Sequence, residues 1–361
     1  MADIDKAITF EDQVELGVRD RSKEMEVEVD IEEENPDFEG FEEMDDGSIM
    51  FGAPTPPMED TNFYSNLAEE LDSSELNSVV NDLMNNIDSD KESRSDWEKT
   101  YKEGLEYLGM KYEERSQPFE GASGVMHPLL AESVTQFQAQ AYNELLPSQG
   151  PVKTQVIGMA NAEIEQQASR VQEFMNYQLM QVMKEYDPET DQMLFYLPLS
   201  GSAFRKVYYD QNLGRAVSKF IPSEDLIVPY AATDLHSATR ITHVIDMSIN
   251  DIKKLQQVGF YRDVDISTGS LLADDVDDVQ SEIDELQGVS PSYDDDDTCR
   301  VHEVHTELDL EGYEDLDSEG EETGIKLPYI ITIANDKVLS IRRNYKETDQ
   351  LKQRINYFVH Y

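Results

Sequence analysis

Residues 119–147 read FEGASGVMHPLLAESVTQFQAQAYNELLP, and the most regular apolar pattern of the chain begins here. Gly121 and the residues up to 124 make a flexible entry, and Pro128 has the fixed φ that suits the first turn of a helix. Apolar residues then recur at steps of four, three, four and four, at Leu130, Val134, Phe137, Ala141 and Leu145. This spacing predicts an amphipathic helix with one buried face, ended by Pro147 and Gly150.

The charge balance limits the classes of function. The 361 residues allow two domains, or one large domain with tails, and they include 77 acids against 29 bases, for a formal charge of −48. This excess excludes a surface that neutralises nucleic-acid phosphates over many contacts, but it allows a surface past which DNA slides. Because self-repulsion opposes compaction, we expect most acids in tails and loops.

Cellular location is suggested by three features. Cys299 is the single cysteine, so it cannot form an internal disulfide and fits a reducing compartment. The N-terminus has no basic start followed by an apolar run, so no secretory signal is visible. The most apolar stretch, Met193–Leu199, is too short to span a bilayer. We therefore expect a soluble, intracellular chain with no membrane partner.

The N-terminal third is expected to hold an acidic arm and a helical leader. Residues 1–60 contain 21 acids and four bases, which predicts disorder, with one short β-like run at 48–51. Helical spacing over 61–118 predicts one helix containing 67–87, then a second helix capped by Ser93 or Ser95 and ended by Gly109. The second helix carries Trp97 on its apolar stripe.

Residues 119–260 are expected to form an α+β core of long helices followed by antiparallel strands. Val152–Ile157 predicts a short strand, and Met159–Tyr186 predicts one long helix that packs on a globular body. Asp187 before Pro188 predicts the cap and first turn of a helix that runs to about residue 197. Ser248 with Asp251 resembles a capping box for a helix over 249–258, and Gly259 suits a left-handed helix end.

The strands follow in a fixed order and are separated by acidic segments. Alternating or β-branched runs predict strands at 203–209, 215–221, 226–228, 239–247, 299–310, 329–334 and 338–343. Between them, an acidic insertion over 261–298 has 11 acids and no base within 271–297. We expect a β-hairpin region over 299–345, and residues 346–361 to begin a further C-terminal part that packs against the apolar residues 357–361.

Two patterns suggest metal ligands, and both have a simpler explanation. His302 and His305 lie three apart in an alternating strand, so they should point to opposite faces and not share an ion. The residues from Asp315 to Gly320 imitate the start of a calcium loop, but Lys326 stands where a bidentate glutamate is required. We therefore expect ordinary strand histidines, a solvated acidic loop and no metal.

No catalytic or cofactor site is predicted either. The glycine-containing segment 121–124 precedes a helix and could face a phosphate, but it lacks the Gly-Lys-Ser/Thr ending of a nucleotide loop. Ser123 with His127 suggests a nucleophile, yet no Gly-x-Ser-x-Gly elbow surrounds the serine. Trp97, Phe137 and Phe174 sit on helical stripes and are expected in the core. We expect no enzyme activity and no cofactor.

Several segments carry a resemblance, in order along the chain. They are SDWEKTYKEGL (95–105), FEGASGVMHPLLAE (119–132), YNELLP (142–147), GSAFRKVYY (201–209), VPY (228–230), Asp246-Met247 and FVHY (358–361). Together they resemble the portal (head-to-tail connector) proteins of tailed bacteriophages, especially the large portals of short-tailed phages. The matching part resembles the wing, an α+β body. The stem, clip and crown of the family would follow Tyr361, so the chain resembles the N-terminal half.

This resemblance implies a homo-oligomeric ring of twelve subunits at one capsid vertex of the virion, assembled from chains made in the host cytoplasm. Double-stranded DNA would be packaged and ejected through the ring without specific binding, and the terminase, the capsid and tail or adaptor proteins would dock on it. The candidate packing and assembly positions are Trp97, Phe119, Gly121, Pro128, Phe137 and Tyr142. Two alternatives stay open: an acidic interaction or scaffold protein or DNA mimic, and a metal-dependent hydrolase.

Overall fold

A computed structural model of the chain describes residues 41–43, 49–51, 63–109, 119, 121, 127–158, 161–210, 213–266, 298–316 and 321–361. The chain divides into two compact units, Met1–Glu59 and Asp60–Tyr361. In the first unit, β1 (Phe41–Glu43) pairs antiparallel with β2 (Ile49–Phe51), which confirms the short strand predicted near 48–51. The predicted disorder of the rest of the arm, and the acidic segment 271–297, lie outside the described residues.

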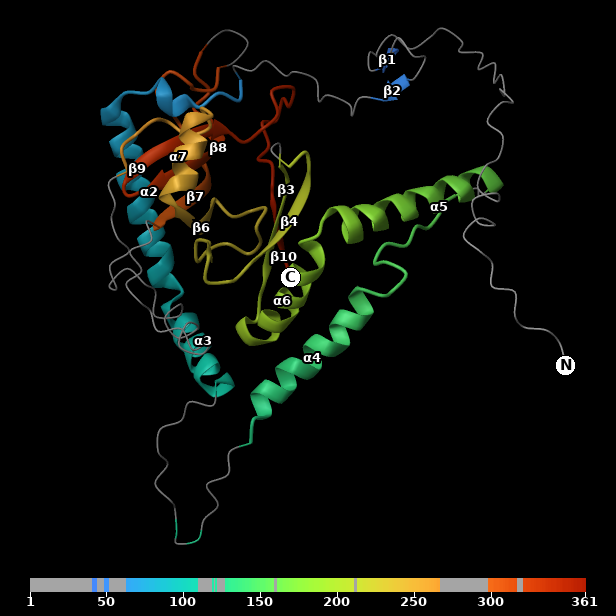
Figure 1. Cartoon of the computed structure of the whole chain (residues 1–361). Coiled ribbons are helices and arrows are strands. Elements are labelled where there is room, and N and C mark those ends of the chain that lie inside the picture. The colour runs from blue at the N-terminus through green and yellow to red at the C-terminus, as the bar shows by residue number, and fades with distance from the viewer. Residues whose placement is uncertain are drawn as a thin grey trace, which may run out of the picture. The chain divides into compact units, whose positions relative to one another are not determined.

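The second unit has an α+β fold, as predicted, with two antiparallel sheets (Figure 1). One sheet has the strand order β5-β6-β7-β8-β9 and the other has the order β10-β3-β4. The strands are β3 (Phe204–Asp210), β4 (Arg215–Ile221), β5 (Leu226–Ile227), β6 (Arg240–Ser248), β7 (Thr298–Leu308), β8 (Leu327–Ala334), β9 (Lys337–Arg343) and β10 (Phe358–His360). The strands predicted from alternation are therefore confirmed, including the β8–β9 hairpin, whose turn residues Asn335 and Asp336 have φ of 46° and 56°.

The main core lies between the five-stranded sheet and α2 (Ser73–Ser93), which follows the short 3-10 turn η1 (Leu67–Glu69). The predicted stripe of α2 is buried against β7, β8 and β9, at Leu76, Val80, Leu83 and Ile87. Burial of such side chains stabilises the fold by roughly 1.5–3 kcal/mol each. This contact fixes α2 on the sheet (Figure 1).

The junction between α2 and α3 (Ser95–Leu108) differs from the prediction. Neither Ser93 nor Ser95 caps α3. Arg94 occupies the N-cap position, but its side chain makes no capping hydrogen bond. The hydroxyl of Ser93 donates to the carbonyl of Asp90 in α2. The guanidinium of Arg94 donates instead to three backbone carbonyls of the turn at 223–226. A contact across the fold has replaced the local cap. Gly109 ends α3, as predicted.

Two further helices meet beside the smaller sheet. α6 (Tyr186–Ser200) packs between α4 (Leu129–Leu145) and β4, around Met193 and Leu194. The predicted start of α6 was late, because the helix begins at Tyr186 and Asp187 lies in its first turn without capping it. The predicted limits of α4 are confirmed, but Val134 is its single fully buried residue, and the helix otherwise contacts the core through the partly buried Ala141 and Tyr142.

The region between α4 and α6 overturns two predictions. Residues 152–157 form no strand, and the helix expected over 159–186 consists of α5 (Ala162–Tyr177) and the π-helical turn η2 (Gln178–Val182), which ends before α6 begins. The helical segment ends at Met183, whose side chain is buried, whereas Val171 and Met175 earlier on the stripe are exposed. The prediction that the apolar stripe of this helix packs on a globular body is therefore not met within the described residues.

Helix α7 (Ile249–Gln257) forms as its local sequence predicts. The hydroxyl of Ser248 accepts from the backbone N–H of Asp251 at 3.1 Å and donates to the carboxylate of the same residue at 2.8 Å. Gly259 follows with a φ of 77°, a left-handed conformation that favours glycine. Ile252 on the inner face is fully buried.

The outer edge of β9 is closed by a side chain. Asn66 donates from Nδ2 to the carbonyl of Leu339 at 3.1 Å, and its Oδ1 accepts from the backbone N–H of Ile341 at 3.0 Å. The backbone N–H of Arg262 also donates to the carbonyl of Leu339, at 2.8 Å. The amide of Asn66 therefore takes the place of a neighbouring strand.

The apolar C-terminal residues pack within the unit. β10 pairs with β3, and Phe358 is buried with Phe204 and Ile221. The expectation that residues 357–361 need a further part of the protein is therefore wrong for Phe358, whereas Val359 and Tyr361 stay largely exposed.

Candidate functional site

Two of the predicted packing positions meet at α6. The indole Nε1 of Trp97 donates to the carbonyl of Ser200 at 3.0 Å, and its ring stacks on Tyr101 with centroids 5.2 Å apart. The hydroxyl of Tyr142 donates to Oδ1 of Asp187 at 2.6 Å, and this hydrogen bond raises the pKa of Tyr142. The two contacts hold α6 at both ends, from α3 and from α4. Both positions therefore stabilise the chain's own fold.

The other four predicted positions lie at the surface. Phe119 is 68% exposed, and Gly121 has a φ of 87° in open space. Pro128 is exposed and precedes the first turn of α4. Phe137 was expected in the core but is 41% exposed, and Phe174 on α5 is 61% exposed, so both core predictions are wrong. Helical spacing identifies an apolar stripe, but it does not show that anything covers the stripe.

Helix α5 carries an apolar face that the described residues leave uncovered. None of its residues is buried, and Ile164, Val171 and Met175 are 37%, 51% and 44% exposed. We call these three residues and Ala168 the α5 face. Since successive residues are about 100° apart around a helix, the four charged side chains of α5 all lie at least about 100° from Ile164. They are Glu163, Glu165, Arg170 and Glu173.

A flank of α5, and not its apolar face, is held by residues 152–154. Asn176 accepts from the backbone N–H of Val152 at 2.9 Å and donates to the carbonyl of the same residue at 3.1 Å. Gln172 accepts from the N–H of Thr154 at 3.1 Å, and the Thr154 hydroxyl donates to the carbonyl of Ala168 at 3.0 Å. These helix side chains supply the partners that a strand would need, which explains why the strand predicted at 152–157 does not form.

Charge is absent from two exposed stretches of helix. No acid, lysine or arginine occurs within 133–143 of α4 or within 174–182, which covers the end of α5 and η2, although 29% of the chain is charged. Around such stretches an incoming surface meets little of the electrostatic repulsion that covers the rest of the chain. Sequence reasoning assigned the α5 face to the core, and the charge-free stretch that begins at Phe174 includes only Met175 of that face.

A groove of about 420 Å³ lies where the end of α3 meets the start of α4. We call it the α3–α4 groove, and its lining contains no acid, lysine or arginine: Tyr107, His127, Leu129, Leu130 and Ser133. Tyr107 and Leu129 are 54% and 66% exposed. The groove therefore offers an apolar surface that no described residue fills.

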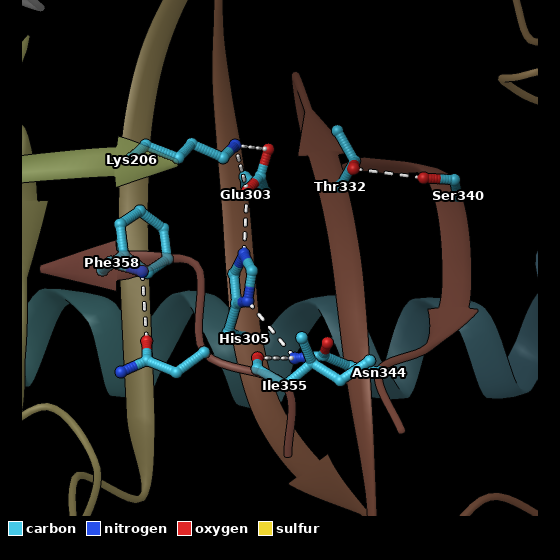
Figure 2. A network of polar contacts seen from close by, with 9 residues as sticks. Lys206, Glu303, His305, Thr332, Ser340, Asn344, Ile355 and Phe358 are labelled. Atoms are coloured by element: carbon cyan, nitrogen blue, oxygen red, sulfur yellow. Dashed lines mark hydrogen bonds and ion pairs between the residues drawn. The ribbon is translucent and has the colours of Figure 1, made fainter. Parts of the chain in front are cut away.

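A buried polar network joins the two sheets (Figure 2). Lys206 of β3 donates from Nζ to both carboxylate oxygens of Glu303 on β7, at 2.6 and 2.7 Å. Oε1 of Glu303 lies 2.8 Å from Nε2 of His305, and Nδ1 of His305 lies 3.4 Å from Nδ2 of Asn344. Asn344 also donates to the carbonyl of Ile355 at 3.1 Å. Both oxygens of Glu303 are engaged, so the network connects the two sheets, whereas Oδ1 of Asn344 is buried without a hydrogen-bond partner.

The charges within this network are fixed by their surroundings. Burial would raise the pKa of Glu303, but Lys206 and His305 outweigh it and hold this pKa well below its usual range. Burial lowers the pKa of His305, and burial with the nearby Lys206 lowers the pKa of His243 to about 3. The network therefore contains one ion pair and neutral histidines near pH 7.

The metal hypotheses find no support within the described residues. His305 contacts Glu303 and Phe358 on one side of the sheet. His302 lies on the other side, near Lys91 of α2, and burial together with this lysine lowers its pKa. The two histidines therefore face opposite sides, as predicted. The carboxylate of Asp315 pairs with Lys352 and accepts from the hydroxyl of Thr323, while residues 317–320 lie outside the description. No group of three or more His, Cys, Asp or Glu in the described part could hold a metal ion.

The other sequence-based candidates are only partly visible. Ser123 and most of 121–124 lie outside the described residues, and His127 is exposed. In the described parts, no helix has the length and apolarity to cross a bilayer. No protein-family model matches the chain, and a comparison with curated proteins finds no match.

Proposed function

We propose that this chain is a subunit of a phage portal ring, which stands at one capsid vertex and through which double-stranded DNA is packaged and ejected. The terminase, the capsid and tail or adaptor proteins would dock on that ring. The order of the segments that resemble portal proteins supports this proposal. The proposal gives the chain no catalytic step and no membrane partner.

The observation that carries the proposal is the uncovered α5 face. A helix of 16 residues is marginal in water by itself, and most helices in proteins are stabilised by packing an apolar face. The described residues hold one flank of α5 through Asn176 and Gln172 and leave the apolar face open. A ring subunit needs such surfaces for its neighbours.

The charge of the chain also fits a DNA conduit. A formal charge of −48 opposes binding to phosphates, so DNA would pass without being held. Since screening reduces electrostatic interactions beyond about 8 Å at physiological salt, only acids near the DNA would act on it.

The acidic scaffold or DNA mimic is less well supported. Such a protein needs an ordered stripe of acids, and α2 is the longest helix on which one could form. Most exposed positions of α2 are serine or asparagine, and its exposed acids are Asp82, Asp88 and Glu92.

The test is the assembly state of the full chain. Size-exclusion chromatography with light scattering should give a mass of many subunits at micromolar concentration, and electron microscopy should show rings with a central hole. Rings at 150 mM salt should not retain linear double-stranded DNA in a filter-binding assay. A chain that stays monomeric at all concentrations, or that binds DNA tightly at this salt, contradicts the proposal.

A further inference from the structure

We propose that the α5 face of one copy binds the α3–α4 groove of the next copy, so that subunits join head to tail through two different surfaces. This inference rests on the proposed ring and identifies the pair of surfaces that would build it.

The first surface is presented outward by the contacts that hold α5. Gln172 and Asn176 lie on one flank of the helix, about 80° and 120° from Ile164. Residues 152–154 bind this flank and so leave Ile164, Val171 and Met175 exposed. Gly150 lies directly against the same flank, since a Cβ there would be 2.4 Å from Cγ of Asn176. The face is therefore fixed in place before any partner arrives.

The second surface is out of reach of the α5 face of the same copy. The groove lies at the N-terminal end of α4, and the chain leaves for α5 from the C-terminal end. At 1.5 Å per residue, the 17 residues of α4 separate these ends by about 25 Å. Figure 1 shows α5 beyond the end of α4 that is remote from α3. Only another molecule can bring the two surfaces together.

The charge of the chain selects a second copy as the occupant. Basic partners would be drawn to the acidic parts of the surface, whereas the α5 face and the groove lining contain no acid. Two copies that each carry −48 repel one another, and this repulsion is weakest where both contacting surfaces are uncharged. The α5 face and the groove are such surfaces, and both are apolar.

The two surfaces are unlike, and this decides the geometry. If α5 paired with α5 of another copy, assembly would stop at two and every groove would stay open. When unlike surfaces pair, the copy at one end keeps a free groove and the copy at the other end keeps a free α5 face, so the chain of subunits grows until it closes. Head-to-tail pairing is therefore the arrangement that uses both surfaces.

The test is disulfide cross-linking of the full chain. Cys299 is 1% exposed, so it adds no background under native conditions. The double variant Met175→Cys with Leu129→Cys should give a ladder of covalent multimers under mild oxidation. Each single variant should give no more dimer than wild type. The matched control, Glu173→Cys with Leu129→Cys, places the thiol on the opposite side of α5 and should give no ladder.

Other outcomes overturn the inference. Strong dimer formation by Met175→Cys alone means that α5 binds α5. Rings in the microscope without a ladder mean that other surfaces join the copies, which leaves the proposed function standing. A wild-type chain that is monomeric removes both proposals.

A second measurement uses exposed sites, so that folding is preserved. Val171→Asp and Leu129→Asp should each abolish rings without changing the melting curve of the monomer. An equal mixture should form heterodimers, because it contains one intact face and one intact groove. Mixtures that stay monomeric, or single variants that still form rings, contradict head-to-tail pairing.

Discussion

Helices α2 and α5 have the same kind of sequence pattern but opposite surroundings. Each carries apolar residues at three- and four-residue steps with polar residues opposite. In α2 the stripe is buried against the five-stranded sheet, whereas in α5 it faces outward. The difference teaches that periodicity reports a need for a partner and does not say whether the partner is in the same chain.

The largest contrast should come from one charged substitution placed in each stripe. Ile87→Asp puts a carboxylate into a fully buried site and should lower the free energy of unfolding by more than about 4 kcal/mol. Val171→Asp should change it by less than about 0.5 kcal/mol in the dissociated chain. Urea unfolding at low protein concentration measures both. Equal losses would mean that the α5 face is buried in the monomer, which would remove the contrast.

Removing one carboxylate in each region sharpens the comparison further. Glu303 lies in the five-stranded sheet that α2 covers, and Glu303→Gln leaves Lys206 buried without its ion pair. This change should lower the free energy of unfolding by about 3–5 kcal/mol. Glu173→Gln on α5 should change stability by less than about 0.5 kcal/mol. The double variant Lys206→Met with Glu303→Leu should lose less free energy of unfolding than Glu303→Gln alone, because it leaves no unpaired charge buried. If it loses more, the ion pair itself stabilises the fold.

Acid should weaken the α2 region and spare α5. Burial lowers the pKa of His302 to about 4 in the folded chain, against an ordinary value of 6.5. Burial of the neutral ring therefore contributes its full stabilisation above pH 6.5. As the pH falls towards 4, His302 takes up a proton in the unfolded chain before it does so in the folded chain, which favours unfolding. Up to about 3 kcal/mol of stability should be lost over this window.

Chemical denaturation at a series of pH values measures this loss, and His302→Gln should make the curve less steep, because only the buried His243 and His305 then remain. The α5 helix contains no histidine, so its amide exchange, corrected for intrinsic rates, should not follow the same curve. Equal slopes for the wild type and His302→Gln between pH 6.5 and 4 would contradict the buried position of His302.

The smallest effect concerns the contacts that hold α5. Asn176→Ala removes two hydrogen bonds to Val152 and should lower the local stability of α5 by about 1–2 kcal/mol. Hydrogen exchange of the α5 amides should then be faster, while α2 amides keep their rates. Asn143→Ala on α4, which removes a contact within one helix, serves as the control. Faster exchange in α2 as well would show that the two helices unfold together.

Local chemistry predicted the elements whose determinants are close in sequence. The spacing in α2, the Ser248 cap of α7 and the tight turn at Asn335 specify their structures within a few residues, and the structure confirms each. The α+β class follows from the same patterns.

Predictions failed where the deciding partner is distant in sequence. The conformation of residues 152–154 depends on Gln172 and Asn176, which lie 18 and 24 residues later in the chain than the residues they bind. The pair of Lys206 and Glu303 spans 97 residues, and no spacing rule connects them. For the candidate site, Trp97 and Tyr142 were identified but proved to hold α6, whereas the α5 face was assigned to a core that is absent from the described part of this chain.

The closed edge of β9 limits how copies of this protein can associate. Asn66 occupies the hydrogen-bonding positions at Leu339 and Ile341 that an incoming strand would need. A second molecule therefore cannot extend the five-stranded sheet at this side, and the route to open-ended, amyloid-like stacking is blocked there. One asparagine thus protects this edge of the sheet against pairing with a strand of another molecule.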